Sequence, residues 1–130
     1  MKRLALILFI FCHGAGSAED SAWVEIATTS TETVIFARKD DINNGRSNQT
    51  DAVVWVKQDH SRDKTTDVRE SKMLLRVNCV ARTYKNITAS AFDPNGKVIL
   101  SKTPSYPKTE FIVPGTIIDE LSGYLCSDPD

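Results

Sequence analysis

The sequence predicts an α+β domain, in which about six antiparallel strands form a sheet and one C-terminal helix packs on one face of it. Short apolar segments alternate with turn-forming residues through most of the chain, which is typical of strands joined in hairpin order. The last apolar segment instead repeats at helical spacing. A helix that follows a run of strands is expected to cover one face of their sheet.

Six segments have the alternation or the β-branched and aromatic content of strands. The turns Asn43-Asn44-Gly45 and Asp93-Pro94-Asn95-Gly96 carry residues that turns favour. Residues 39–50 are polar and are predicted to be a connection. Residues 103–109 hold two prolines, which excludes a central strand. The strands are predicted at residues 23–27, 34–38, 51–58, 73–80, 84–92 and 97–101.

The C-terminal helix is predicted to begin after Pro114-Gly115, which ends the preceding strand. Thr116 is placed to cap the helix, and Asp119 and Glu120 put negative charge near its N-terminus. One face is apolar and leads to Cys126 at its end. A helix of about ten residues is marginal alone, so we expect it to need both a surface and a covalent tie.

Residues 1–18 are predicted to be a secretory signal peptide. Lys2 and Arg3 precede a continuous apolar run, and small residues follow it, with Gly16 and Ala18 at the −3 and −1 positions. The run is too short to span a bilayer, which takes about 20 residues; the alternative is a buried N-terminal strand. A bulky residue precedes Cys12, so lipidation is not expected. The mature domain is then residues 19–130, not lipid-anchored and without a membrane span.

The charge of the mature chain disfavours nucleic acid as a partner. Without the two basic residues of the leader, 14 basic residues stand against 17 acidic ones, a net charge of −3. No long basic run remains.

Two cysteines remain after processing, Cys79 and Cys126, and in an exported chain such a pair usually forms one disulfide. Cys79 shares the apolar face of its strand with Leu75 and Val77, and Cys126 ends the helix expected to cover that face. The alternative is two buried free thiols. Closing a loop of about 47 residues would stabilise the fold by roughly 4 kcal/mol on the chain-entropy model.

His60 is the one histidine of residues 19–130, and it lies among Asp59, Asp63 and Asp67. The spacing of these carboxylates does not match a calcium-binding EF-hand, and one histidine with loop carboxylates is a poor zinc set. We therefore expect a solvated loop. The sequence also contains no nucleophile elbow and no phosphate-binding glycine loop. No catalytic residue, cofactor or metal site is predicted.

Four aromatic residues at strand positions are predicted to be core, with an exposed binding surface as the alternative. They are Trp23, Trp55, Tyr84 and Phe92. One helix covers only one face of a six-stranded sheet. The other face, which carries apolar as well as charged residues, is therefore a candidate surface for a protein partner or a homodimer.

The order of these signals resembles the surface-adhesin protein E family of proteobacterial exported proteins. Trp23-Val24 precedes a strand at residues 53–56, and Ser71-Lys72 leads into a strand that ends Asn78-Cys79. A return strand ends in the Asp-x-x-Gly-Lys-Val pattern at residues 93–98, and Ile-Val-Pro-Gly-Thr at 112–116 enters the helix that ends in Cys126. The likeness covers nearly all of residues 23–126.

The resemblance implies an antiparallel sheet with a disulfide-tied helix, and no catalysis. It also implies a surface-displayed adhesin that binds host extracellular-matrix or plasma proteins. This sequence departs from the family's founding member in lacking a lipidation site. Two hypotheses follow: an exported, non-enzymatic protein-binding module in the periplasm, secreted or on the cell surface of a Gram-negative bacterium, or a periplasmic structural or accessory protein that meets no host molecule. An enzyme ranks third.

Overall fold

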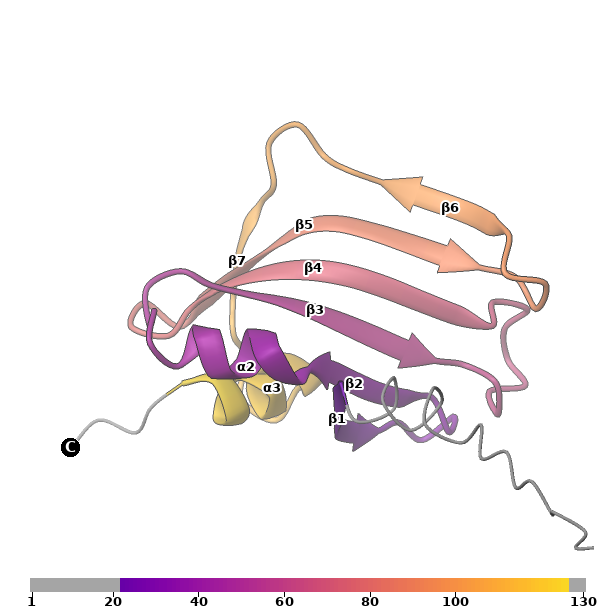
Figure 1. Cartoon of the computed structure of the whole chain (residues 1–130), viewed down its shortest axis with the longest axis horizontal. Helices are drawn as coiled ribbons and strands as arrows, with labels where there is room; N and C mark the ends of the chain where they lie inside the picture. The colour runs from indigo at the N-terminus through magenta and orange to yellow at the C-terminus, as the bar shows by residue number, and fades with distance from the viewer. Residues whose placement is uncertain (1–21, 127–130) are drawn as a thin grey trace, which may run out of the picture.

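Seven strands pair into one antiparallel sheet (Figure 1), in which β1 to β6 each pair with the next strand along the chain and β7 pairs with β5. The computed structural model describes residues 22–126, so the predicted signal peptide, its cleavage site and Cys12 lie outside the described residues. The strands are β1 (Trp23–Thr28), β2 (Val34–Arg38), β3 (Ala52–Asp59), β4 (Glu70–Asn78), β5 (Thr83–Phe92), β6 (Val98–Lys102) and β7 (Thr109–Phe111). The expected sheet is confirmed, with β7 as a further short strand.

The core lies on one face of the sheet. On β3, Ala52, Val54 and Val56 are buried at every second position, because successive strand residues point to opposite faces. Their partners on β4 include Leu75 and Val77, which are 1% exposed. The hydrophobic core unites these positions with residues of both helices: Ile26, Ile35, Ala37, Ile42, Ala52, Val54, Val56, Leu75, Val77, Ile112, Leu121 and Leu125.

A helix, α2 (Lys39–Gly45), occupies part of the segment that the sequence predicted to be an irregular connection, and that prediction is wrong. The helix follows β2 directly and buries Ile42 in the core. Its Asp41 carboxylate accepts a hydrogen bond of 2.9 Å from the backbone N–H of Trp55. This N–H lies just beyond Val56, the last β3 residue paired with β2, so the helix supplies the acceptor that β2 no longer provides.

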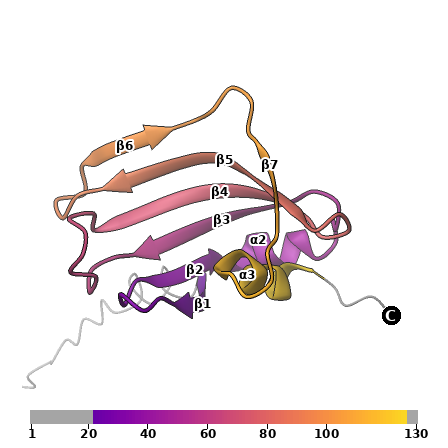
Figure 2. The ribbon, with the colours of Figure 1, turned by 180° about the vertical axis from the view of Figure 1, so that it is seen from behind.

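The C-terminal helix is α3 (Ile117–Leu125), and its cap is the predicted one. The Thr116 hydroxyl accepts a hydrogen bond from the N–H of Asp119. The Gly115 N–H and the Arg82 guanidinium both donate to the Asp119 carboxylate and hold its pKa below the ordinary value. The helix lies behind α2 in Figure 1 and in front of it in Figure 2, and it buries Leu121 and Leu125.

The predicted disulfide joins Cys79, just after β4, to Cys126 at the end of α3. It closes a sequence separation of 47, with 5.5 Å between the two Cα atoms. Gln49 adds a second connection at the same place. Its carbonyl accepts from the Cys79 N–H at 2.7 Å, and its side-chain amide donates to the carbonyl of Leu125 at 3.1 Å. The end of α3 is thus held to the sheet covalently and by hydrogen bonds.

Candidate binding surfaces

One edge of the sheet is formed by β6, and all five of its residues are exposed. Val98, Ile99 and Leu100 are 51%, 48% and 53% exposed, so three large apolar side chains in a row are about half in contact with solvent. An edge strand also presents unpaired N–H and C=O groups. The strand therefore offers both apolar area and hydrogen-bonding groups to another chain.

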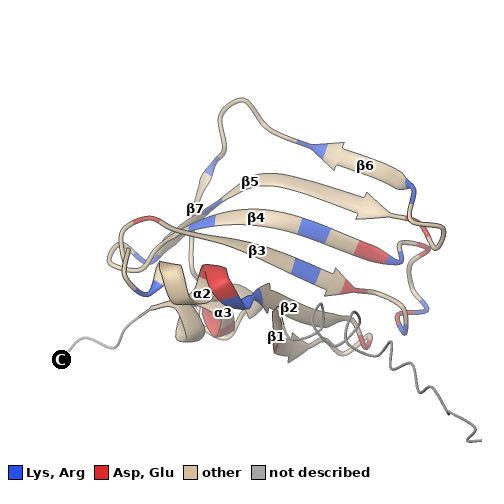
Figure 3. Ribbon diagram, in the orientation of Figure 1, with Lys and Arg blue, Asp and Glu red and all other residues tan. Residues whose placement is uncertain are grey.

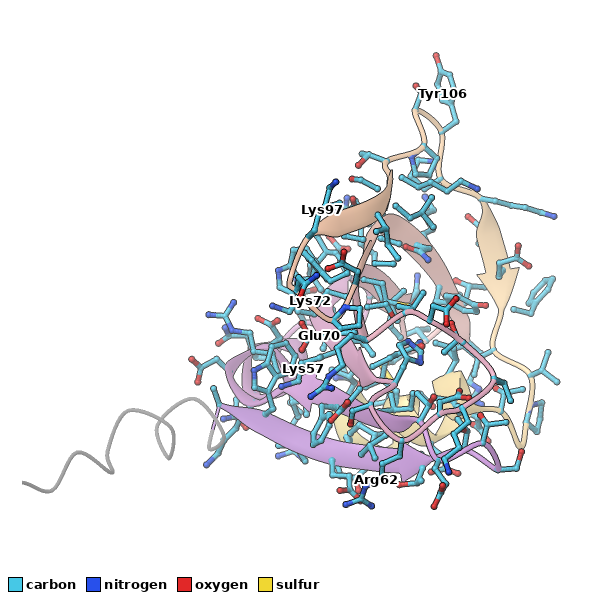
Figure 4. The ribbon with its side chains drawn as sticks, turned by 90° about the vertical axis from the view of Figure 1, so that its right-hand side faces the viewer. Lys57, Arg62, Glu70, Lys72, Lys97 and Tyr106 are labelled. Atoms are coloured by element: carbon cyan, nitrogen blue, oxygen red, sulfur yellow. A yellow bond between two sulfur atoms is a disulfide. The ribbon has the colours of Figure 1, made fainter. Side chains whose placement is uncertain are left out.

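The short strand β7 continues this edge. It pairs with the start of β5 on the side opposite β4, which is also the side where β6 pairs with the end of β5. Between the two strands the chain leaves the sheet, and Tyr106 projects from the tip of that loop (Figure 4), 93% exposed. Phe111 on β7 is 78% exposed. We call residues 98–111 the β6–β7 edge.

A second surface is the sheet face that points away from the core, which we call the outer face. Because Val54 and Val56 are buried, Trp55 and Lys57 point to this face. Strand pairing places Phe36 opposite Lys57 and Lys57 opposite Lys72, so these side chains form a row across three strands. Figure 3 shows basic positions on the central strands β3 and β4, and Figure 4 shows Lys57 and Lys72 on the same side of the molecule.

Aromatic rings of the outer face contact its lysines. The Lys57 Nζ atom lies 4.6 Å from the centre of the Trp23 ring and 4.9 Å from that of Phe36. The Lys72 Nζ atom lies 5.9 Å from the centre of the Phe92 ring. These distances fall within the range of cation–π attraction. The rings therefore help to hold two long basic side chains over the face.

A shallow hollow opens on the outer face, with a volume of about 280 Å³. Its lining consists of Trp23, Arg38, Trp55 and Lys72, one residue from each of β1, β2, β3 and β4. Trp23 and Arg38 are direct partners in the sheet. We call these four residues the Trp–Arg hollow. It combines two indole rings with two cations on a scaffold of paired strands.

The prediction that the four aromatic residues belong to the core is wrong for three of them. Tyr84 packs against the core, but Trp23, Trp55 and Phe92 are half-buried on the outer face, as the pairing of their strands shows. Alternation in a strand separates two faces without saying which one is buried. The signal that was missed lies in β3, where Trp55 alternates with the smaller Val54 and Val56 that fill the core.

His60 lies in a hydrogen-bonded network and is half-buried, whereas most of the loop that follows it, residues 61–67, is exposed, as expected. The Thr33 hydroxyl donates to the Asp63 carboxylate at 2.8 Å, so its oxygen accepts from the His60 Nδ1–H at 3.0 Å. In the neutral ring, Nε2 then accepts from the Ser71 hydroxyl at 2.9 Å. The network ties the start of β2 to the end of β3 and the start of β4.

Asp63 is the anionic end of this network. Hydrogen bonds from Thr65, Thr33 and Thr31 hold the pKa of its carboxyl far below the ordinary value. Within residues 22–126, no three histidine, cysteine or acidic side chains are grouped so that they would hold a metal ion. In the same part of the chain, neither helix has the length and apolar character that crossing a membrane requires.

Sequence reasoning did not single out Arg38, Lys57 or Lys72. Each is an ordinary basic residue in its own strand, and only the pairing of four strands gathers them. The one signal in the sequence was the position of Lys57 two residues after Trp55, on the same face of β3. The β6 segment was predicted as a strand, but its place at the sheet edge became clear only from the pairing.

Comparison with known proteins gives one match. The family model of surface-adhesin protein E matches residues 23–127, which is most of the chain and includes the whole described sheet, both helices and both cysteines of the disulfide. Searches of curated proteins and of solved structures returned no match. A family of surface adhesins implies a surface or exported protein that binds other proteins and is not an enzyme. The chain belongs to the surface-adhesin protein E family.

Proposed function

We propose that the protein is an exported adhesin-type module that binds a host extracellular-matrix or plasma protein through the β6–β7 edge, without catalysis. The observation that carries this proposal is β6, an edge strand exposed along its whole length with three consecutive large apolar residues. The family to which the chain belongs supports protein binding, and the sequence pattern of residues 1–18 supports export.

An edge strand binds an extended segment of a partner by adding it to the sheet. The backbone then supplies hydrogen bonds, and Val98, Ile99 and Leu100 supply apolar contacts.

Charge favours an acidic partner segment over a second copy of this chain. Lys97 and Lys102 flank the apolar residues of β6. In antiparallel pairing of two copies, each copy would bring a lysine to both ends of the paired segment, so cations would gather there without an acidic partner from β6. A foreign strand with acidic residues at its ends fits better, and a homodimer is the alternative outcome of the test.

The test measures binding of the exported protein to a panel of immobilised matrix and plasma proteins. We expect dose-dependent binding to at least one of them. Ile99→Glu should abolish it, because it removes apolar area and adds a charge that repels an acidic segment. The control is Val80→Glu, which makes a similar change at a turn residue that is 74% exposed and lies outside the edge.

Sedimentation of the free protein and fractionation of the producing cells complete the test. If the free protein is a dimer and Ile99→Glu converts it to a monomer, the edge serves self-association instead. Absence of binding across the panel, with the protein confined to the soluble periplasmic fraction, would reject the adhesin role. It would leave the periplasmic structural or accessory function.

A further inference from the structure

The outer face carries an arrangement that lowers the stability of a sheet. Lys57 and Lys72 stand directly opposite each other on β3 and β4, and like charges in that position are destabilising. Arg38 adds a third cation nearby, in the lining of the Trp–Arg hollow. Local departures from what stability favours are expected at functional sites. An anion bound among these three cations would offset the repulsion between them.

Among the described residues, these three cations make one ion pair with an acidic side chain. Glu70 lies 3.9 Å from the Lys72 ammonium, at side-chain exposures of 35% and 41%, and an exposed pair of that length contributes little. Within residues 22–126, the Arg38 side chain has no hydrogen bond or ion pair. Among the described residues, none therefore competes for its guanidinium with a carboxylate or sulfate, which such a group binds with two parallel hydrogen bonds.

The two indoles of the hollow indicate what the anion is attached to. The faces of Trp23 and Trp55 carry the negative side of a quadrupole, and the axial C–H groups of a sugar ring are weakly positive. The volume, about 280 Å³, is slightly below that of typical small-molecule sites and suits a single ring. All four lining residues belong to paired strands, which hold a site more precisely than loops do.

We propose that the Trp–Arg hollow binds an acidic sugar of a glycan, with Arg38 and Lys72 on its carboxylate or sulfate and the indoles of Trp23 and Trp55 against its ring. Lys57 helps to hold the Trp23 ring in place, because its ammonium lies 4.6 Å from the centre of that ring. The ligand differs in kind from the protein segment assigned to the β6–β7 edge. The two surfaces lie on different parts of the sheet.

Other anionic ligands fit this site less well. Single-stranded nucleic acid is bound in a basic groove that follows its backbone, whereas this is one shallow hollow on a chain of net negative charge. An acidic peptide would satisfy the cations but offers no ring to both indoles. We therefore treat an acidic peptide as the alternative that the experiment must separate.

The experiment measures binding of the exported protein to heparin fragments, hyaluronan, neutral dextran and polyglutamate at physiological salt. Heparin presents sulfates and uronates, and hyaluronan presents uronates alone. We expect binding to at least one of these two acidic glycans, no binding to dextran and much weaker binding to polyglutamate. Failure to bind either acidic glycan overturns the proposal, and so does equal binding to polyglutamate.

Variants locate the site. Arg38→Gln should weaken glycan binding about tenfold or more, the effect of losing one charge-assisted contact. Its matched control is Arg62→Gln, which removes the same charge from an exposed loop position and should leave binding unchanged. Trp55→Leu should weaken binding while Trp55→Phe retains part of it, because phenylalanine keeps an aromatic face. Circular dichroism verifies that each variant is folded.

Equal losses in Arg38→Gln and Arg62→Gln would show attraction by overall charge and would overturn the proposal. Ile99→Glu should leave glycan binding unchanged, because β6 is not part of the hollow. Loss of protein binding in that variant with intact glycan binding separates the two proposals from each other.

Discussion

Gly45 and Leu125 are in close contact where α2 meets α3. A Cβ atom built on Gly45 would lie 3.0 Å from Cδ2 of Leu125 and 3.0 Å from Cβ of Ala52. Leu125 is fully buried, and Ala52 is 1% exposed. The two helices and β3 therefore meet at a point where a residue larger than glycine would force its neighbours to shift.

We predict that Gly45→Ala destabilises the protein. The added methyl group overpacks the contact, which typically costs about 1–3 kcal/mol, and alanine returns at most about 1 kcal/mol of helix propensity. The net loss should be about 1 kcal/mol, measured by urea unfolding. Gly123→Ala in α3 is the matched control, because a Cβ there meets no atom within 4 Å. It should be stabilising, and a stabilising Gly45→Ala would contradict the packing.

Removal of the disulfide should lower the free energy of unfolding by about 2–4 kcal/mol. Cys126→Ala, Cys79→Ala and the double variant should all lose the same amount, because both cysteines act through one bond. The first structural effect should be loosening of α3, seen as faster amide hydrogen exchange. Peptide mapping without reductant should recover one linked pair, and two free thiols in native protein would disprove the bond.

The Asp63 carboxylate should make stability depend on pH. Its folded pKa is lowered, so its contribution is present above the unfolded value of about 3.9 and is lost as pH falls toward the folded value. Asp63→Asn should therefore be less stable than the parent near neutral pH, with a difference that shrinks as pH falls below about 4. Urea midpoints measured across this range test it. Asp67→Asn, in the same loop, is the matched control, because among the described residues the Asp67 side chain makes no hydrogen bond or ion pair.

Processing should remove residues 1–18. N-terminal sequencing of the exported protein should begin at Glu19 or within a few residues of it, without a lipid, because the small residues Gly16 and Ala18 precede that bond. An Ala18→Arg variant should retain its leader. A mature chain that begins at a modified Cys12 would contradict the prediction and would restore lipid anchoring at the surface.

The sequence predicted the strands, the α3 cap and the disulfide because each depends on local chemistry or on alternation. Thr116, for example, caps a helix wherever its neighbours are helical. The helix α2 was not predictable in this way. Its asparagines and glycine favour turns, and Ile42 is its one large apolar residue. Contacts with the rest of the fold stabilise this helix, and they involve residues distant in sequence, such as Leu125.

The candidate surfaces could not be predicted from the sequence either, because they depend on which strands pair with one another. Arg38 and Lys72 lie 34 positions apart in the numbering, and nothing in either strand indicates that they line one hollow with Trp23 and Trp55. The exposure of β6 also could not be read from its composition. Val-Ile-Leu is as typical of a buried central strand as of an edge, and strand order decides between them.

The sequential strand order has a consequence for the time course of folding. Each strand up to β6 pairs with the next one along the chain, and such hairpins form within roughly 1–10 μs. The helix α3, however, packs back against β1, and Cys79 must wait for Cys126, 47 positions later. At a synthesis rate of roughly 5–20 residues per second, that interval is about 2–9 s. A chain that emerges N-terminus first therefore holds an unpaired thiol and an uncovered apolar sheet face for seconds, which is long enough for a holdase or an oxidant to intervene.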